Sequence, residues 1–181
     1  MFNQKKAQHL ISYILSKFDR RIECIKLIKL VYYIDRESIA QTGFSVSTDR
    51  YVSMKHGPVS SNIYSLINDE YRGVNNWSDS IRREGHDVIA LNANCEYDSL
   101  SEKDLEIVDE MLFKYGKWDK WKLVDETHKP EDDQGFSDWK GNDNGMKEIS
   151  KKEMMEHLHG FSEADIKEVL EQEQLNALMY G

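Results

Sequence analysis

The tripeptide His56-Gly57-Pro58 is the first place in this sequence where side chains could carry chemistry. An imidazole acts as a general base when a nucleophile and an orienting acid lie within reach. Cys24 is the available nucleophile, but it lies within a predicted helix among apolar residues, where a buried thiol usually only fills space. A helix that begins at Pro58, beside Lys55 and His56, could instead hold an anion. One hypothesis is therefore a hydrolase or phosphate-handling enzyme centred on His56 and the helix N-terminus at Pro58.

The same tripeptide also has a purely structural interpretation, which the sequence favours. Gly57 allows a strand to end sharply, and Pro58 suits the first position of a helix because its missing N–H would be unpaired there anyway. In this interpretation His56 packs and forms hydrogen bonds locally. A further hypothesis places the His56 ring against His128, so that the two meet across the fold beneath this corner.

Two other groups of residues could suggest a ligand. His157 and His159 lie two apart, so on a helix they point to different faces, and no other cluster has the spacing of a zinc site. Trp118, Trp121 and Trp139 could stack on bases, but their acidic neighbours would repel a phosphate backbone, and we expect core aromatics. There is no phosphate-binding glycine loop and no G-x-S-x-G motif. We therefore expect no metal and no cofactor.

Charge is distributed unevenly along the 181 residues, which carry a formal net charge of -9. Residues 1–72 hold 11 Lys and Arg and 7 Asp and Glu, whereas residues 73–181 have a net charge of -13. An acidic surface disfavours direct nucleic-acid binding and favours a basic protein partner. The two cysteines form no disulfide framework, so we expect reduced thiols and a cytoplasmic protein. No apolar run approaches the length of a membrane span, and no membrane partner is expected.

Hydrophobic periodicity predicts the elements that must position these residues. An apolar stripe over 7–18 predicts one helix, and a second, buried on most sides, spans about 22–41 and stops at Gly43. A weakly alternating segment at 46–55 predicts a strand, and the next helix begins at Pro58. Residues 77–91 predict a β-hairpin with its turn at Gly85.

Capping patterns mark the helices of the second half. Ser101 and Asp104 resemble a capping box that opens a helix, helical spacing resumes through Trp118 to His128, and Ser150 with Glu153 opens the first of two C-terminal helices. The fold class predicted is α+β: a mostly helical single domain with a small antiparallel β element (a strand near 46–55 and a hairpin near 77–91) and a C-terminal helical extension.

The order of three segments carries a family resemblance. The helix "IKLIKLVYYIDRESIAQTG" is followed by "DRYVSMKHGPVSSNIY", and later by "WKLVDETH" and a downstream Trp139. This order resembles the Panacea domain, the SocA-like antitoxin family, also known as the phage-associated GepA-type domain. The resemblance covers roughly residues 5–140, and the run from Lys26 to Tyr64 is its specific part. We accordingly expect an antitoxin domain at 1–146 and a C-terminal helical extension at 147–181, packed on the same domain.

The resemblance implies an antitoxin encoded beside a toxin, and it does not imply an enzyme. Family members neutralise toxins of several unrelated kinds, generally by binding them, and one branch delivers its toxin to a cytosolic protease. The expected partners are thus a cognate toxin protein and, in the second case, a protease. The family-signature or structural positions in this sequence are Lys26, Leu27, Lys29, Leu30, Tyr32, Asp35, His56, Gly57, Pro58, Val59, Tyr64, Thr127, His128 and Trp139.

The C-terminal segment from Glu153 to Glu173 holds seven acidic residues and one lysine. Such a strip usually forms a solvated face of a helix pair, and that interpretation is favoured. The alternative is that it steers or masks a basic toxin.

Overall fold

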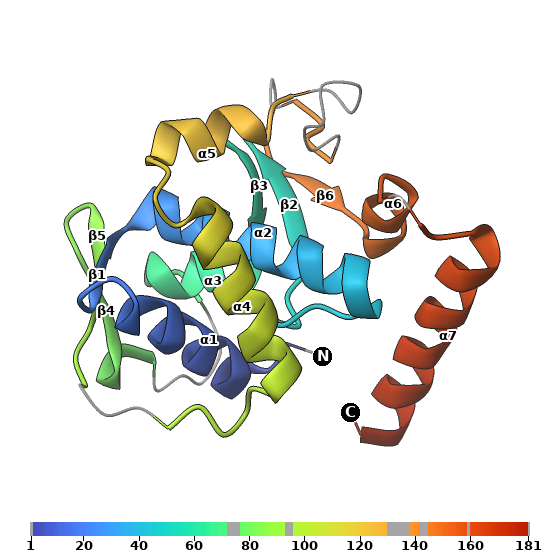
Figure 1. Ribbon diagram of the computed structural model, residues 1–181, viewed down its shortest axis with the longest axis horizontal. Helices are drawn as coiled ribbons and strands as arrows, with labels where there is room; N and C mark the ends of the chain where they lie inside the picture. The colour runs from blue at the N-terminus through green and yellow to red at the C-terminus, as the bar shows by residue number, and fades with distance from the viewer. Residues whose placement is uncertain are drawn as a thin grey trace.

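The computed structural model describes residues 2–71, 77–92, 96–129, 138–141, 145–158 and 160–180. Helices predominate, and two three-stranded antiparallel sheets flank them (Figure 1), so the predicted α+β, mostly helical fold is confirmed. Within the described ranges, no helix has both the length and the apolar character needed to cross a membrane.

Helix α2 (Cys24–Thr42) is the centre of the fold (Figure 1). Apolar residues occur around most of its circumference, which is the pattern of a helix enclosed by other elements, and α4 and β3 lie against it. The helix ends at Gly43, whose φ of 78° is the left-handed conformation predicted for this position. Helix α1 (Gln4–Ser16) buries its apolar stripe, including Leu10 and Ile14, in the same core.

The first sheet has the strand order β1-β5-β4 and supports the N-terminal end of α2. Strands β4 (Ile81–Glu84) and β5 (Asp87–Ala90) form the predicted hairpin, and Gly85 in its turn has a φ of 60°. Strand β1 (Arg21–Glu23) was not predicted: the second helix was expected from Ile22 but begins at Cys24. The chain pairs with β5 first, and the Cys24 N–H is bonded to the His86 carbonyl.

The second sheet has the strand order β3-β2-β6 and corrects the prediction at Pro58. Strand β2 (Tyr51–Met54) is shorter than the segment predicted at 46–55, and it turns directly into β3 (Gly57–Ser60). Pro58 therefore lies in a strand and does not begin a helix. Helix α3 (Ser61–Ile67) starts after Ser60. Because β3 is an edge strand, a proline without an N–H is tolerated there.

Helices α4 (Glu102–Tyr115) and α5 (Lys120–Glu126) cover α2 on one side (Figure 1). The predicted capping box is present, since Ser101 and Asp104 each accept from the other's backbone N–H. Trp77 lies in the short 3-10 segment η1 (Trp77–Asp79) and is buried. The predicted helical run towards Pro130 is interrupted at Gly116 and ends at Glu126, and Pro130 itself lies outside the described residues.

The C-terminal part begins with a strand that the sequence did not predict. Strand β6 (Lys147–Ile149) pairs with β2, and helix α6 (Lys151–Glu156), opened by the predicted capping box at Ser150, buries Met154 and Met155 in the core. Helix α7 (Glu163–Tyr180) then runs along the edge of the molecule (Figure 1). A domain boundary at 146/147 stays a prediction, and residues on both sides of it contribute to one sheet.

Candidate functional site

The corner between β2 and β3 brings together signature residues from three distant parts of the chain. Lys29 of α2 donates from Nζ to the Pro58 carbonyl at 2.7 Å, and Thr127, just after α5, lies against Gly57. Gly57 has a φ of 89°, and a Cβ added there would lie 2.7 Å from Lys29 Nζ and would collide with Thr127 Oγ1. Only glycine fits this position, for steric and conformational reasons together. We call Lys29, Gly57, Pro58 and Thr127 the corner cluster.

Lys29 is the charged member of the corner cluster and is fully buried. Burial lowers the pKa of its ammonium to about 7, because the charged form loses its hydration. One described acceptor, the Pro58 carbonyl, faces an ammonium that has three donors. This lysine therefore changes charge near neutral pH, far below the range of an exposed lysine.

The two histidines beside the corner cluster each lie against a tryptophan. The His128 ring is 4.1 Å from the Trp139 ring between centroids, and His56 meets the edge of Trp121 at 6.0 Å. Burial, followed by the charge of Lys29, lowers the pKa of His128, and His56 contributes in the same direction. Within the described part of the chain no hydrogen bond joins the two rings, and the buried His128 Nε2 has no partner. They share the corner, but their direct contact stays a hypothesis.

A second polar cluster lies further along α2, around Asp35. Its buried carboxylate accepts hydrogen bonds from the Ser47 backbone N–H (2.8 Å), the Ser47 hydroxyl and the Ser60 hydroxyl (3.3 Å). Burial raises the pKa of Asp35 to about 6 in spite of these donors. The nearby Asp49 carboxylate accepts from the Ile63 backbone N–H at 2.9 Å and so holds the start of α3. These contacts fix the loop after α2 and β3 to the core.

Asp138 is a central residue that sequence reasoning missed. It is 1% exposed and accepts from Tyr32 Oη at 2.5 Å and from Arg36 Nε at 2.8 Å, while His157 Nδ1 lies 3.0 Å away. The neighbouring Trp139 donates to the Met54 carbonyl at 3.0 Å. Asp138 and Trp139 together connect α2, the end of β2 and the residue after α6 to one another. The only sequence signal was the place of Asp138 beside a signature tryptophan.

The remaining signature positions serve packing. Lys26 donates to the Gly116 carbonyl at 2.7 Å and lies over the Phe18 ring, away from the corner cluster. Fully or nearly fully buried signature residues are Leu27, Leu30 and Val59, and Tyr64 is partly buried. Most of the fourteen predicted positions are buried or partly buried, whereas His56 is exposed.

The geometry does not support the nucleophile that the sequence raised. Cys24 is buried, and burial raises the pKa of its thiol, whereas a reactive cysteine needs a lowered pKa. The helix N-terminus expected at Pro58 is not there, because Pro58 belongs to β3. Among the described residues no group of three His, Cys, Asp or Glu side chains is arranged to hold a metal. His159 and Cys95 lie outside those residues.

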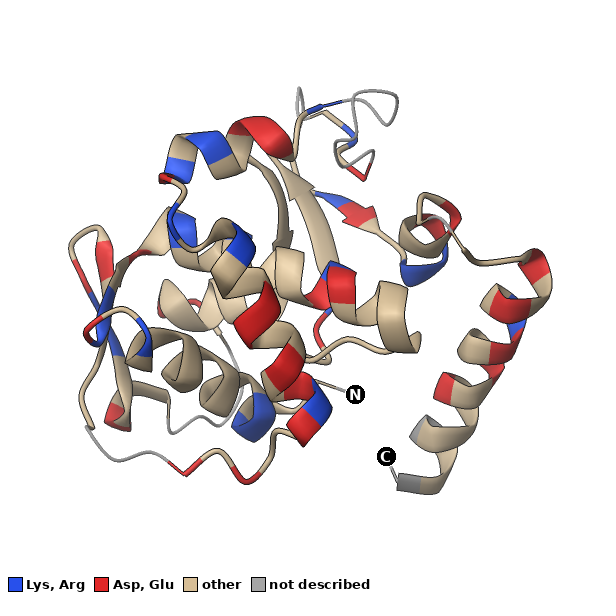
Figure 2. Ribbon diagram, in the orientation of Figure 1, with Lys and Arg blue, Asp and Glu red and all other residues tan. Residues whose placement is uncertain are grey.

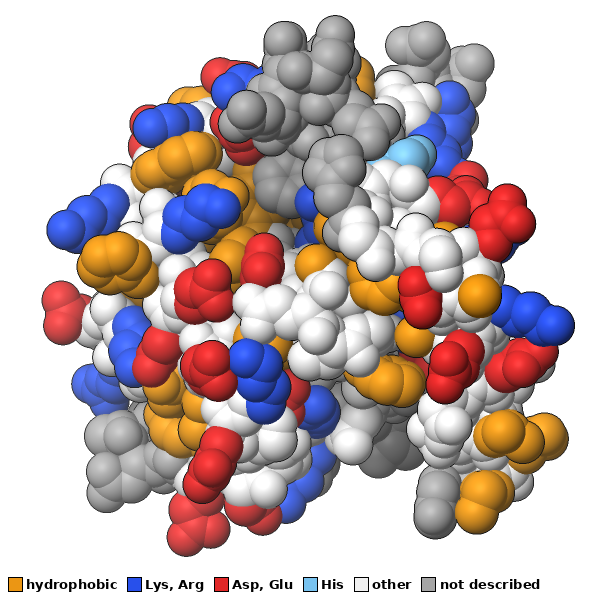
Figure 3. All heavy atoms as spheres, turned by 45° about the vertical axis from the view of Figure 1, so that its right-hand side comes forward, with side chains coloured by type: hydrophobic (Ala, Val, Ile, Leu, Met, Phe, Trp, Pro, Cys, Tyr) orange, Lys and Arg blue, Asp and Glu red, His pale blue; other side chains and the backbone are white. Residues whose placement is uncertain are grey.

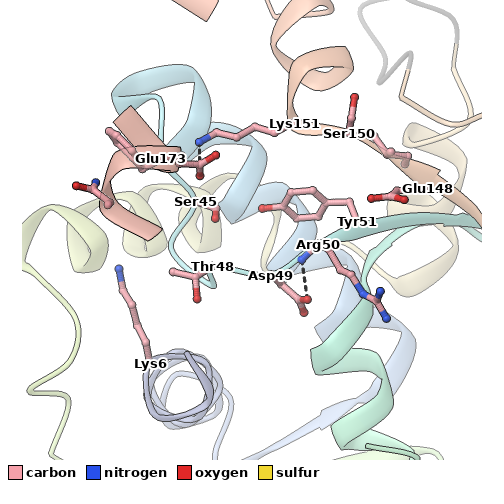
Figure 4. A pocket seen from close by; sticks show the side chains of 13 residues that line it. Lys6, Ser45, Thr48, Asp49, Arg50, Tyr51, Glu148, Ser150, Lys151 and Glu173 are labelled. Carbon is pink, nitrogen blue, oxygen red and sulfur yellow. Dashed lines mark hydrogen bonds and ion pairs between the residues drawn. The ribbon is translucent and has the colours of Figure 1, made fainter. Parts of the chain in front are cut away.

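Among the cavities that open on the surface of the described residues, two lie beside the features above. The smaller, of about 290 Å³, lies beside the corner cluster and reaches Cys24, Lys29, His56 and Arg83. The larger, of about 760 Å³, separates α7 from the body of the protein. Its lining carries both signs of charge, and the Lys151–Glu173 ion pair of 2.6 Å crosses it (Figure 4).

These features define a mostly helical domain in which buried polar side chains, among them Lys29, Asp35 and Asp138, connect separate elements. The family model of the SocA-like antitoxin, Panacea domain, matches residues 27–133, from the first turn of α2 to beyond α5. The chain belongs to this family. The match confirms the resemblance found in the sequence and is narrower than the expected 5–140, so it does not include Lys26 or Trp139. No curated protein and no solved structure matches the chain.

Proposed function

We propose that this protein is the antitoxin of a toxin–antitoxin pair and neutralises its cognate toxin by direct protein binding. The observation that carries the proposal is the match of the antitoxin family model to residues 27–133. The largely internal placement of the signature residues supports it, because such residues hold a binding scaffold in shape. The proposal includes a cytoplasmic location and no direct contact with nucleic acid, in keeping with the net charge of -9.

Helix α7 supports a protein partner of basic character. Among its described exposed side chains five are acidic, including Glu163, Glu168 and Glu171, and one is basic (Figure 2). Near the C-terminal end of this helix, Leu178 is 84% exposed and Met179 is 69% exposed. Figure 3 shows uncovered hydrophobic side chains on this side of the molecule. Acidic side chains next to uncovered apolar ones suit a partner with a basic rim and an apolar centre. This helix is therefore the surface on which we expect a basic toxin to be steered.

Delivery of the toxin to a protease is the second form that neutralisation could take in this family. Direct binding leaves the amount of toxin in the cell unchanged, whereas delivery lowers it. The two forms are thus separated by the toxin level that accompanies rescue.

The test is co-expression with the product of the neighbouring gene. The neighbouring gene alone should stop growth, co-expression of this protein should restore it, and the two proteins should co-purify as a complex. Quantitative immunoblots of the toxin then distinguish binding from delivery. A neighbouring product that is harmless alone, or one that remains lethal when this protein is present, would contradict the proposal.

A further inference from the structure

The smaller cavity is lined by residues from both sheets and from the start of α2. Its lining residues come from the β1–α2 junction and the start of α2, the β2–β3 hairpin, α3 and the residue after it, the β4–β5 hairpin, and the start of α5. Its volume of about 290 Å³ admits one large side chain or a small aromatic molecule. Because both sheet turns and three helices contribute, the cavity is part of the built fold.

The base of the cavity is apolar. Buried lining residues are Cys24, Ile28 and Val59, with the partly buried Met54 and Tyr64 beside them. Burial of an apolar group in the cavity would contribute about 25 cal/mol of favourable binding free energy for each Å² of apolar surface removed from water. The base therefore selects for an apolar body but gives no orientation.

The wall of the same cavity carries a net positive charge. The exposed cations Lys55 and Arg83 line it together with Lys120, His56 and His86, and the buried Lys29, whose pKa is lowered to about 7, also contributes to the lining. Among its described lining residues the one carboxylate is Glu23, and Lys120 Nζ already pairs with it at 2.6 Å. This concentration of positive charge stands in a protein of net charge -9, so the cavity is a local positive potential on an acidic molecule.

Arg83 is held in place before any ligand arrives. Its Nε donates to the Gly85 carbonyl at 2.9 Å and its Nη1 to Asn68 Oδ1, which ties the β4–β5 turn to the residue after α3. A guanidinium fixed in this way loses little freedom when it meets an anion. The dipole of α2, whose N-terminal end lies at the cavity, adds to the positive potential.

We propose that this cavity binds a carboxylate attached to an apolar body, presented by the cognate toxin as an acidic residue or chain end next to an apolar side chain. The apolar base takes the side chain, and Lys55 and Arg83 meet the carboxylate at the wall. This inference rests on the proposed antitoxin function for the identity of the ligand, whereas the chemistry of the cavity stands on the lining residues alone.

The experiment uses the full chain and two small probes that share one apolar body. N-acetylphenylalanine carries a carboxylate, and N-acetylphenylalanine amide does not. In ¹⁵N-resolved NMR titrations, the carboxylate should shift resonances of the cavity residues, and the neutral amide should bind about fivefold or more weakly, a difference of roughly 1 kcal/mol. Equal affinities of the two probes, or tighter binding of adenosine monophosphate, would overturn the proposal.

Two variants locate the effect. Lys55→Glu changes an exposed side chain at the wall and should weaken the carboxylate about fivefold without a change in melting temperature. Lys167→Glu makes the same charge change on α7, outside the cavity lining, and should leave the affinity unchanged. If both variants weaken the probe equally, only net charge matters and the cavity site is wrong.

Toxin binding is then compared between wild type and Lys55→Glu. Lower toxin affinity of Lys55→Glu with an unchanged melting temperature supports the toxin as occupant, and equal affinity overturns it while the antitoxin function stands. The antitoxin function itself fails earlier, if the wild-type protein does not bind or neutralise the toxin.

Discussion

The corner cluster and helix α7 differ in burial: the first lies inside the protein and the second is mostly exposed. At the corner, family-signature residues are buried and touch one another, and one added methyl group at Gly57 has no room. Along α7, which the family match does not reach, most described side chains are exposed and the charges face water. The comparison indicates that the predicted signature residues at the corner mainly maintain the shape of the fold. Under the proposed antitoxin function, the toxin is then recognised by other surfaces built over the same core.

Asp138 connects α2 to the residue that follows α6. Its carboxylate meets Tyr32 and Arg36 of α2 on one side and His157, between α6 and α7, on the other. A buried carboxylate with these partners is costly to leave unpaired, so it fixes where the C-terminal part leaves the core. This contact lies just before the segment that leads into α7.

Among the tests of this comparison, we expect the largest loss of stability from the substitution Gly57→Ala. The residue has a φ of 89° and no room for Cβ, so the substitution combines backbone strain with a collision against Thr127 Oγ1 and Lys29 Nζ. We expect the free energy of unfolding to fall by about 3 kcal/mol. Urea denaturation followed by circular dichroism measures this change.

Gly85→Ala is the matched control, because Gly85 also has a positive φ, 60°, but no atom lies within 4 Å of its added Cβ. We expect a loss of about 1 kcal/mol from backbone strain alone. Equal losses at the two glycines would mean that the close contact at the corner has no energetic weight, and the contrast between corner and surface would be lost.

A second, smaller effect concerns the pH dependence that Lys29 gives to folding. Burial lowers its pKa to about 7 in the folded protein, from the 10.5 that is usual for a lysine in water. Between these values the unfolded chain binds a proton that the folded chain does not, so stability rises with pH by up to roughly 1.4 kcal/mol per pH unit. Denaturation of wild type and Lys29→Met from pH 7 to pH 9 should show this rise in wild type only. The range ends at pH 9 because an exposed cysteine thiol, with its usual pKa of 9.0, titrates there once Cys24 is unfolded.

Lys103→Met, on the exposed face of α4, is the control and should keep the wild-type slope. Lys29→Met keeps an apolar stem of similar length but gives up the bond to the Pro58 carbonyl. The free energy of unfolding of Lys29→Met therefore combines the lost hydrogen bond with the altered packing. The slope of that free energy against pH reports only the loss of the titrating group. A slope that persists in Lys29→Met would show that another group is responsible.

The helices could be predicted because their apolar periodicity is local in the sequence. The short strands could not, because they depend on pairing with segments far away in the chain. The stripe of α1 and the stop at Gly43 follow from residues a few positions apart. Strands β1 and β6 have three residues each and exist because they pair with β5 and β2. Pro58 was misread because a proline suits both the first turn of a helix and an edge strand.

The candidate site was predictable in its residue types and not in its assembly. The sequence predicted signature positions at Lys29, Gly57 and Thr127, but nothing local in the sequence indicates that these residues meet. Asp138 could not be found, since a buried loop aspartate is defined by its partners on α2. The extension expected from residue 147 in fact starts as a strand of the sheet, and a chain ended at Gly145 would lose Met154 and Met155 from the core.

The smallest effect is expected from charge alone, on α7. Glu168→Gln with Glu171→Gln removes two exposed charges and should change the free energy of unfolding by less than about 0.5 kcal/mol. If α7 steers a basic toxin, the association rate should fall about threefold at low salt and by much less at physiological salt, where screening acts within about 8 Å. Stopped-flow association with the toxin measures the rate at both salt concentrations.

Glu106→Gln with Glu110→Gln is the control, because it makes the same charge change on α4, and it should leave the association rate nearly unaltered. Equal slowing by both pairs would assign the effect to net charge, and no slowing by either would make α7 a solvated face only.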